Sequence, residues 1–356
     1  ASQTLLFIAL SHFITKVRFL WRRMLKLLFA PMATLSHEAL RRTIEHYSPN
    51  ACDEYYTEMI QATTFIGGGK FEQFYVRSGP CPEKIVWQLT CGKAEPMAEA
   101  AKIIGALGGI GIDINMGCCA PEIVKQGAGI SWMLKDKSET EQMIRMVKKA
   151  INQNMRLSVK MRLGDENYNM KDLCNFVDML IFEGTTQIVL HPRTRKSKFR
   201  YQPHWQNAEY LFEYVEKKYN NSVECCINGD IVDFQSLCNV RKAVIKSKGF
   251  MIGRAAVQKP WIFGVIAQKL KEEKDSDFVH SQKKAENIDS LELVCEFLDN
   301  LTECQPEEFW ISRAKRFFAY FCKNFEFGHY LETQINNAKD LNKMKKVFES
   351  YFEKMP

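Results

Sequence analysis

One cysteine of this chain, Cys118, directly follows a short apolar segment that predicts a buried strand. The segment covers residues 111–117, and Ile112, Ile114 and Met116 alternate along it before a glycine turns the chain. Reacting groups of α/β barrels lie just beyond the carboxyl ends of such strands. No serine, histidine and aspartate set surrounds this thiol, so it is better suited to donating a proton than to acyl transfer. The alternative is a buried cysteine that only fills space, which is the commonest role of a free thiol.

Polar or cationic side chains follow nearly every other segment that predicts a strand. Lys160 could place a positive charge at the mouth of a barrel, where it would stabilise a reduced, anionic flavin ring. Gln88 and His191 could hydrogen-bond the edge of the same ring. The alternative for Lys160 is a lysine inside the barrel that pairs with Asp113 or Glu58. The residues at these strand ends are Ala30, Pro31, Met32, Ala33, Gln88, Asn115, Lys160, Arg162, His191, Arg193, Asn228, Asp230 and Arg254.

The last two strand ends have the composition of a phosphate site. The sequence Asn228-Gly229-Asp230 predicts a tight turn whose backbone amides can face an anion. The pair Gly253-Arg254 lets the backbone come close to a ligand and adds a guanidinium group. Loops after the seventh and eighth strands commonly hold phosphate in the TIM barrel. We therefore expect a phosphorylated ligand at these two loops.

Eight predicted strands alternate with helical patterns over residues 25–272, and this alternation predicts an α/β fold of the TIM (β/α)8 barrel type. A doubly wound sheet has the same alternation, but no G-x-G-x-x-G sequence follows the first strand here. The predicted strands cover residues 25–32, 51–59, 84–91, 111–117, 156–164, 187–191, 223–229 and 250–253. The predicted helices cover residues 37–47, 96–107, 139–152, 170–183, 208–219, 234–245 and 260–271.

The C-terminal part of the chain has a different pattern. Residues 273–290 are polar and charged, which predicts a linker, and residues 291–356 show only helical periodicity. We expect three or four helices there, in a small all-helical domain. Basic residues cluster over 313–323 and 339–346. A solvated helix face is the default interpretation of each cluster, and contact with a phosphate backbone is the alternative.

Residues 1–24 form an apolar and then basic segment. A signal peptide has its positive charges before the apolar run, and this run is too short to span a bilayer. We expect a poorly ordered leader rather than an amphipathic surface helix. The twelve cysteines contain no C-x-x-C pair, so we expect a reducing, cytoplasmic protein with no metal site and no membrane span. The net charge of +7 is compatible with a polyanionic partner.

The motifs at the strand ends resemble those of the tRNA-dihydrouridine synthase family. The resemblance covers about residues 28–268 and is weaker over the C-terminal helices. In chain order the motifs are APMA (30–33), WQL (87–89), DINMGC (113–118), APEIVKQGAG (120–129), KMRLG (160–164), HPRTR (191–195), NGDI (228–231), MIGRAA (251–256) and PWIF (260–263). Tyr201 and Trp205 also match residues of the family.

This resemblance implies an FMN-binding barrel followed by a helical tRNA-binding domain, in a monomeric enzyme that reduces tRNA uridines to 5,6-dihydrouridine. NADPH, or NADH, would reduce the flavin, and the flavin N5 would then transfer hydride to C6 of the uracil. Cys118 would protonate C5 as a general acid, because an ordinary thiol is protonated at neutral pH. A uracil inside a folded tRNA must be flipped out before it can reach the mouth of a barrel.

The resemblance also assigns residues to the two ligands. Flavin binding falls to Pro31, Met32, Ala33, Gln88, Lys160, His191, Asn228, Gly229, Asp230, Gly253 and Arg254. Asn115 would orient substrate or flavin. From their charge we also expect Arg162, Arg193 and Arg195 to contact the substrate, and the RNA backbone would be held by Arg193, Arg195, Lys196, Lys198 and Arg200 and by the helical domain.

One residue departs from the family pattern, since Cys119 stands where the family usually has proline. This change frees the backbone and places a second thiol beside Cys118, which keeps the role of acid because it still follows the glycine. Two other functions stay open: an FMN barrel that acts on a free small molecule, like a dihydroorotate dehydrogenase, and a tRNA-binding module with a vestigial flavin site. The helical domain disfavours the first, and the presence of Cys118, Lys160 and Arg254 disfavours the second. The tRNA position that is modified is left open.

Overall fold

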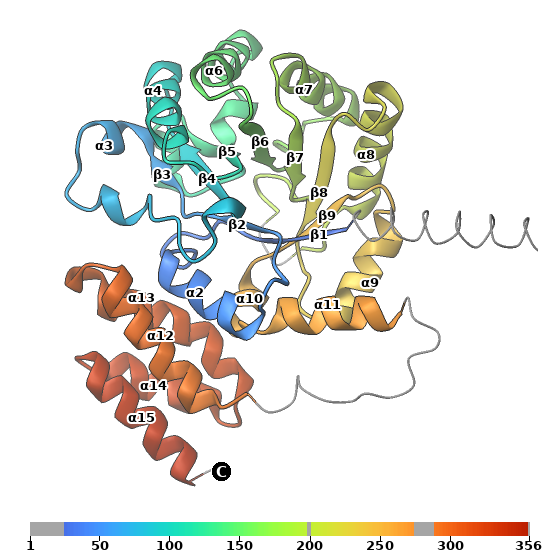
Figure 1. The fold of residues 1–356 in the computed structure, drawn as a ribbon. Coiled ribbons are helices and arrows are strands. Elements are labelled where there is room, and N and C mark those ends of the chain that lie inside the picture. The colour runs from blue at the N-terminus through green and yellow to red at the C-terminus, as the bar shows by residue number, and fades with distance from the viewer. Residues whose placement is uncertain (1–24, 198–200, 274–287, 355–356) are drawn as a thin grey trace, which may run out of the picture.

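The computed structural model describes residues 25–197, 201–273 and 288–354. Its larger part is a closed barrel of parallel strands surrounded by helices, and a smaller helical unit packs against one side of it (Figure 1). The strand order around the ring is β2-β1-β9-β8-β7-β6-β5-β4, and pairing of β2 with β4 closes it. The predicted TIM barrel followed by helices is therefore confirmed. The predicted leader and residues 274–287 of the predicted linker lie outside the described residues.

The strands are short and buried, as in other parallel sheets that are covered by helices. The eight strands of the ring are β1 (Lys26–Phe29), β2 (Glu54–Tyr56), β4 (Ile85–Thr90), β5 (Gly111–Met116), β6 (Arg156–Met161), β7 (Gln187–Leu190), β8 (Glu224–Asn228) and β9 (Gly249–Ile252). The helices around them are α2 (Glu38–Tyr47), α3 (Ala62–Ile66), α4 (Ala94–Gly105), α5 (Pro121–Lys125), α6 (Lys137–Ala150), α7 (Met170–Phe182), α8 (Trp205–Tyr219), α9 (Phe234–Ala243), α10 (Arg254–Gln258) and α11 (Ile262–Glu272).

The strand predicted over residues 51–59 is shorter than expected and is followed by a two-residue strand, β3 (Ile60–Gln61), which pairs with β4 beside the ring. Tyr56 pairs with Val86, and Ile60 pairs with Leu89. One more residue therefore separates the two pairings on this strand than on β4, so residues 57–59 form a bulge. Bulges re-aim side chains next to active sites, and this one lies beside the mouth of the barrel.

Alternate residues of the strands face two separate cores. Leu28 of β1 belongs to a small apolar cluster inside the barrel, whereas Leu27 and Phe29 pack between the strands and the helices. The period of two follows from strand geometry, in which successive side chains point to opposite faces. A polar layer fills much of the remaining interior, and it contains Gln88, Asp113, Asn115, Ser158, Lys160 and Gln187.

An ionic network closes the N-terminal end of the barrel. The guanidinium of Arg156 donates to both carboxylate oxygens of Glu54 at 2.7 Å. The Lys26 ammonium bridges Glu54 and Glu224, at 3.3 and 2.7 Å. Because this end carries the structural role in TIM barrels, the network leaves the opposite end for ligands.

The C-terminal unit has four helices, α12 (Ser290–Cys304), α13 (Glu307–Phe321), α14 (Gly328–Asn337) and α15 (Leu341–Lys354), within the expected three or four. Phenylalanine rings form its core, with Phe297 and Phe317 stacked at 3.9 Å between centroids. The unit packs beside α2 and α10 (Figure 1). Asn324, just after α13, donates to the carbonyl of Gln258 at 2.6 Å.

The twelve cysteines all lie in described segments, and each is a free thiol. In the ranges that the structure covers, no helix is both long enough and apolar enough to cross a bilayer. The same ranges contain no group of three or more histidine, cysteine or carboxylate side chains arranged to hold a metal ion.

Candidate active site

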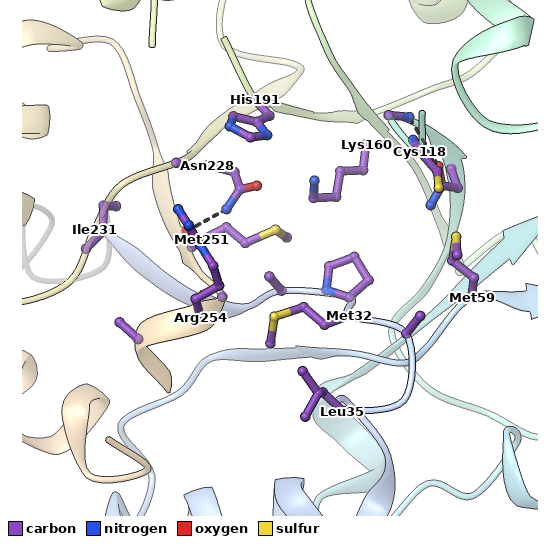
Figure 2. A pocket seen from close by; sticks show the side chains of 18 of the residues that line it. Met32, Leu35, Met59, Cys118, Lys160, His191, Asn228, Ile231, Met251 and Arg254 are labelled. Carbon is purple, nitrogen blue, oxygen red and sulfur yellow. Dashed lines mark hydrogen bonds between the residues drawn. The ribbon is translucent and has the colours of Figure 1, made fainter. Parts of the chain in front are cut away.

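A cavity of about 490 Å³ opens at the carboxyl ends of the strands (Figure 2). This volume lies in the range of sites for small molecules and cofactors. Figure 2 shows Cys118 and Met59 on one side of the cavity, Arg254 and Ile231 on the other, and Lys160 between them. Of the residues predicted from the sequence, the cavity is lined by Pro31, Met32, Ala33, Asn115, Cys118, Lys160, Arg162, His191, Asn228, Gly229, Asp230, Gly253 and Arg254.

The loop that carries Cys118 is held by hydrogen bonds from two sides. The Asn115 Oδ1 atom accepts from the amides of Gly117 and Cys118, at 3.1 and 3.0 Å. The amide of Ile130 donates to the carbonyl of Cys118 at 3.0 Å. Gly129 makes this approach possible, because its φ is +61° and a Cβ there would lie 2.5 Å from the Cys118 carbonyl oxygen.

The two adjacent cysteines have different surroundings. Cys118 lines the cavity, whereas the thiol of Cys119 lies 3.5 Å from the carbonyl of Gly117 and does not line it. Burial raises the pKa of Cys118 above its ordinary value, although the nearby charges of Arg162 and Lys160 act in the opposite direction. The Cys118 thiol is therefore protonated at neutral pH, as a proton donor must be.

A chain of hydrogen bonds inside the barrel supports this loop from below. Gln88 donates from Nε2 to Asp113 at 2.7 Å and accepts at Oε1 from the side-chain amide of Asn115 at 2.9 Å. The other oxygen of Asp113 accepts from the hydroxyl of Ser158 at 2.7 Å. Gln88 is fully buried and does not line the cavity, so in this structure its contacts support Asn115. Burial raises the pKa of Asp113 to about 6.

Lys160 projects into the cavity (Figure 2), and burial lowers its pKa to about 8, with the charge of Arg162 as the next cause. The alternative ion pairs are not formed in the described part of the chain, since Asp113 accepts from Gln88 and Ser158, and Glu58 pairs with Arg313. The amine is therefore still mostly protonated at pH 7.

His191 is a neutral member of the site. Burial lowers its pKa to about 2, and the charges of Lys160, Arg162, Arg193 and Arg254 contribute to this shift. A neutral imidazole beside several cations can hydrogen-bond a ligand without adding to the positive charge of the cavity.

The opposite wall of the cavity contains the predicted phosphate loops. The backbone of Gly229 has a φ of +134°, and a Cβ there would lie 3.2 Å from Cδ2 of His191. Asp230 accepts from Arg254 at 3.2 Å and from Arg193. Asn228 donates to the carbonyl of Met251 at 2.9 Å, which joins strands β8 and β9 at this wall.

Three of the predicted arginines have distinct positions. Arg162 lines the cavity and donates to the carbonyl of Gly117 at 2.9 Å. Arg193 is 1% exposed, and its guanidinium contacts Asp230, His191 and the Tyr201 carbonyl, so it orders the wall from behind. Arg195 lies 3.8 Å from Asp165 and does not line the cavity. Lys198 and Arg200 lie outside the described residues.

Several lining residues were missed by sequence reasoning. Met59 and Met251 belong to segments whose pattern predicts strands, so they have no signal beyond that of core residues. Arg316 and Tyr320 come from α13 of the C-terminal unit. Arg316 lies in the basic cluster of residues 313–323, which was the only available signal, because the docking of a helix on a barrel is not visible in a linear pattern.

The fold and the cavity define an α/β-barrel enzyme that places a protonated thiol opposite a cationic wall. Comparison with protein families identifies the family. The chain belongs to the dihydrouridine synthase (Dus) family, whose model matches residues 28–355. It is thus an enzyme of the tRNA-dihydrouridine synthase family, and the resemblance stated from its motifs is confirmed.

Relatives in three bacteria have similar sequences over 81% or more of their length. The probable tRNA-dihydrouridine synthase 1 of Synechocystis sp. is 26% identical over 312 residues, which cover 87% of this chain and 81% of the relative. The probable tRNA-dihydrouridine synthase of Helicobacter pylori strain 26695 is 24% identical, with 92% of each chain covered. That of Aquifex aeolicus is 25% identical, with 92% of this chain and 96% of the relative covered.

The cavity suits a ligand with a flat apolar part and an anionic end. The side chains of Met32, Leu35, Met59 and Met251 offer polarisable or apolar contacts. Lys160 and Arg254 bring positive charge, and a side chain at Gly229 would crowd the ring of His191. These residues fit the isoalloxazine ring and phosphate of a flavin mononucleotide, the cofactor on which this family depends in general.

Proposed function

We propose that this chain reduces uridines in tRNA to 5,6-dihydrouridine, with FMN as cofactor and NADPH or NADH as the source of electrons. The observation that carries the proposal is that one cavity is lined by a protonated thiol, a lysine, two loops suited to phosphate, and an arginine and a tyrosine of the C-terminal unit. Membership of the dihydrouridine synthase family supports the substrate class.

The residues that would hold FMN come from both walls of the cavity. Pro31, Met32 and Ala33 would contact the ring, and Asn228, Gly229, Asp230, Gly253 and Arg254 would surround the phosphate. Gln88 would act through Asn115 rather than by direct contact, because it is buried behind it. Bound FMN would supply a hydride from its N5 atom to C6 of the uracil.

Lys160 and His191 would set the electrostatics of the reaction. Lys160 is mostly protonated at pH 7, so its charge would stabilise negative charge that develops on the ring system. His191 would donate or accept a hydrogen bond as a neutral group. Together they would stabilise an anion, and the charge of His191 would not change near neutral pH.

Cys118 would complete the reduction as the general acid. Its thiol would transfer a proton from Sγ to C5 of the uracil, so that hydride at C6 and proton at C5 together saturate the double bond. The thiolate that remains would be stabilised by the charges of Lys160 and Arg162, which already favour it in this structure. Because burial raises the thiol pKa, water would return the proton readily at neutral pH.

The RNA would enter from the side where α13 meets the barrel. Arg316 is exposed at this rim, and Tyr320 lies beside it with the ammonium of Lys323 over its ring at 5.2 Å. An aromatic ring flanked by cations suits an extruded base and its phosphates. Asn115 and Arg162 line the inner part of the cavity, where the uracil itself would lie.

The test is the reduction of tRNA by a Cys118→Ala variant. Without the acid we expect the rate of dihydrouridine formation to fall by about 10²- to 10⁴-fold, while binding of FMN and tRNA stays unchanged. The product is measured by mass spectrometry of digested tRNA, as a gain of two mass units at a mapped position. The neighbouring variant Cys119→Ala is the matched control, because its thiol does not line the cavity.

The possible outcomes test the role of Cys118 and the reaction itself separately. Full activity of Cys118→Ala, or loss of activity in Cys119→Ala alone, would contradict the assignment of the acid. A wild-type protein that binds tRNA but neither binds FMN nor forms dihydrouridine would contradict the proposed reaction itself.

A further inference from the structure

A buried ion pair joins the C-terminal unit to the barrel. The guanidinium of Arg313, on α13, donates to Oε2 of Glu58 at 2.7 Å, and both side chains are only 3% exposed. Glu58 lies in the bulge between β2 and β3, beside the pocket-lining residue Met59. The rings of Phe309 and Tyr75 face the guanidinium, with their centroids at 4.9 and 5.7 Å.

The second oxygen of the same carboxylate holds a turn in the cavity wall. Oε1 of Glu58 accepts from the backbone amide of Thr34 at 2.5 Å. Thr34 has a φ of +65°, which is unfavourable for a β-branched residue, so the turn needs support from its surroundings. Thr34 directly follows Pro31, Met32 and Ala33, which line the cavity.

The Oε2 atom of Glu58, through Arg313, holds another part of the cavity wall, which α13 forms. Arg316 and Tyr320 follow Arg313 at spacings of three and seven residues, so the three side chains share one face of α13. Arg316 and Tyr320 line the cavity, whereas Arg313 does not. One carboxylate therefore connects the wall formed by residues 31–33 with the wall formed by α13.

A purely stabilising role does not account for this pair. Replacing a buried ion pair by apolar residues of similar volume is often neutral or stabilising, since burial of two charges is costly. An apolar pair could not accept the hydrogen bond that the Thr34 amide donates to Glu58 while the same carboxylate holds α13 through Arg313.

We propose that Glu58 and Arg313 are positioning residues that tie the flavin wall to the RNA wall of the cavity. The proposal rests on the proposed function, because it names FMN and tRNA as the ligands of the two walls. Arg313 then influences the binding of a cofactor that it does not touch. Glu58 likewise influences contacts with RNA that are made by Arg316 and Tyr320.

The experiment uses the full chain with the double substitution Glu58→Leu/Arg313→Met, which removes both charges and avoids an unpaired one. Two quantities are measured: the dissociation constant of FMN, from flavin fluorescence, and kcat and KM with tRNA. We expect FMN affinity to fall by about tenfold or more and KM for tRNA to rise, as displaced walls would cause, while the cooperative unfolding transition is kept. The single variant Arg313→Lys keeps the charge but not the forked geometry of arginine. Its FMN affinity and its KM for tRNA should therefore lie between those of the wild type and those of the double variant.

A second ion pair between α13 and the barrel provides the control. Lys70 and Glu308 are 2.7 Å apart, and their side chains are 73% and 51% exposed. Their double substitution by alanine should leave both the FMN affinity and the KM for tRNA within about twofold of the wild type, because exposed ion pairs contribute little.

The outcomes are distinct. A folded Glu58→Leu/Arg313→Met variant with unchanged FMN affinity and unchanged KM would overturn the positioning role and leave the proposed function intact. Equal losses in the Lys70/Glu308 control would also overturn it, because they would show that any weakening of this interface has the same effect. A wild-type protein that binds no FMN would instead contradict the proposed function.

Discussion

Asp113 sets the direction of the hydrogen bonds that reach the loop of Cys118. An ionised carboxylate only accepts, so Gln88 must turn its Nε2 toward Asp113 and its Oε1 toward Asn115. Asn115 must then donate to Gln88 and present its own oxygen to the amides of Gly117 and Cys118. The position of the proposed acid therefore depends on a charge that is three hydrogen bonds away from it.

The raised pKa of Asp113 gives a prediction about stability. Its pKa is about 6 in the folded protein against an ordinary value of 3.8, so the folded state binds the proton more tightly than the unfolded state does. Ionisation between pH 4 and pH 7 therefore costs folding on the order of 3 kcal/mol. In Asp113→Asn this cost is absent. We expect the free energy of unfolding of the variant, relative to the wild type, to increase by this amount between pH 4 and pH 7, as measured by urea denaturation.

Asp178 serves as a control of opposite sign. Partial burial raises its pKa, but hydrogen bonds from Lys218, Tyr214 and Tyr219 outweigh this effect and lower the pKa overall. Asp178→Asn should therefore lose stability relative to the wild type as the pH rises from below the lowered pKa to the ordinary pKa of the group, and it should keep this deficit at higher pH. The same trend in both variants would contradict the account of Asp113.

At the scale of elements, α13 has two faces with different tasks. Phe317, Phe318 and Phe321 are buried in the aromatic core of the C-terminal unit. The face with Arg313, Arg316 and Tyr320 meets the barrel and its cavity. The helix ends in a tight connection to α14, where Gly328 is required because a Cβ there would lie 2.0 Å from the carbonyl oxygen of Cys322.

The residue before this glycine gives a prediction about that connection. Phe327 has a φ of +51°, and its side chain is 64% exposed. An L-residue is disfavoured in this left-handed conformation, and glycine is not. Phe327→Gly should therefore be more stable than Phe327→Ala by about 1 kcal/mol in thermal or urea denaturation. Both variants lose the same exposed ring, so the comparison isolates the backbone, and equal stability would show that the turn relaxes.

At the scale of the whole molecule, the net charge of +7 is modest, so binding of RNA must depend on where the cations lie. Arg316 is exposed at the rim of the cavity and is the cation of α13 that lines it. Lys217, on the outer helix α8, instead pairs with Glu213 at 2.6 Å. A phosphate contact is thus expected from Arg316 and not from Lys217.

The salt dependence of tRNA binding tests this difference. Arg316→Ala should weaken binding and reduce the slope of log K against log salt concentration by about one, which corresponds to the loss of one phosphate contact. Lys217→Ala should change neither quantity. An unchanged slope in Arg316→Ala would mean that this arginine contacts no phosphate, whatever its effect on the affinity.

Much of the barrel was predictable from the sequence because its signals are local. Alternating apolar residues mark each strand, and reacting groups follow strand ends, so most of the predicted residues line one cavity. Contacts between distant segments have no such local signal. Arg193, which is predicted to contact the substrate, is buried against Asp230, and Gln88, which is predicted to contact the flavin, lies behind Asn115. Arg316 and Tyr320 line the cavity only because the C-terminal unit docks on the barrel. The direction of Glu58 depends on a bulge of one residue at 57–59.

The cavity is lined by residues of both the barrel and α13, and this has a consequence for protein engineering. If the C-terminal helices of a relative were grafted onto this barrel to change which uridine is reduced, the graft would also replace Arg313 and with it the partner of Glu58. A chimera joined in the segment between α11 and α12 would therefore disturb the cofactor wall as well as the RNA surface. To exchange specificity between such enzymes, the barrel residue at position 58 and the helix residue at position 313 should therefore be taken from the same parent.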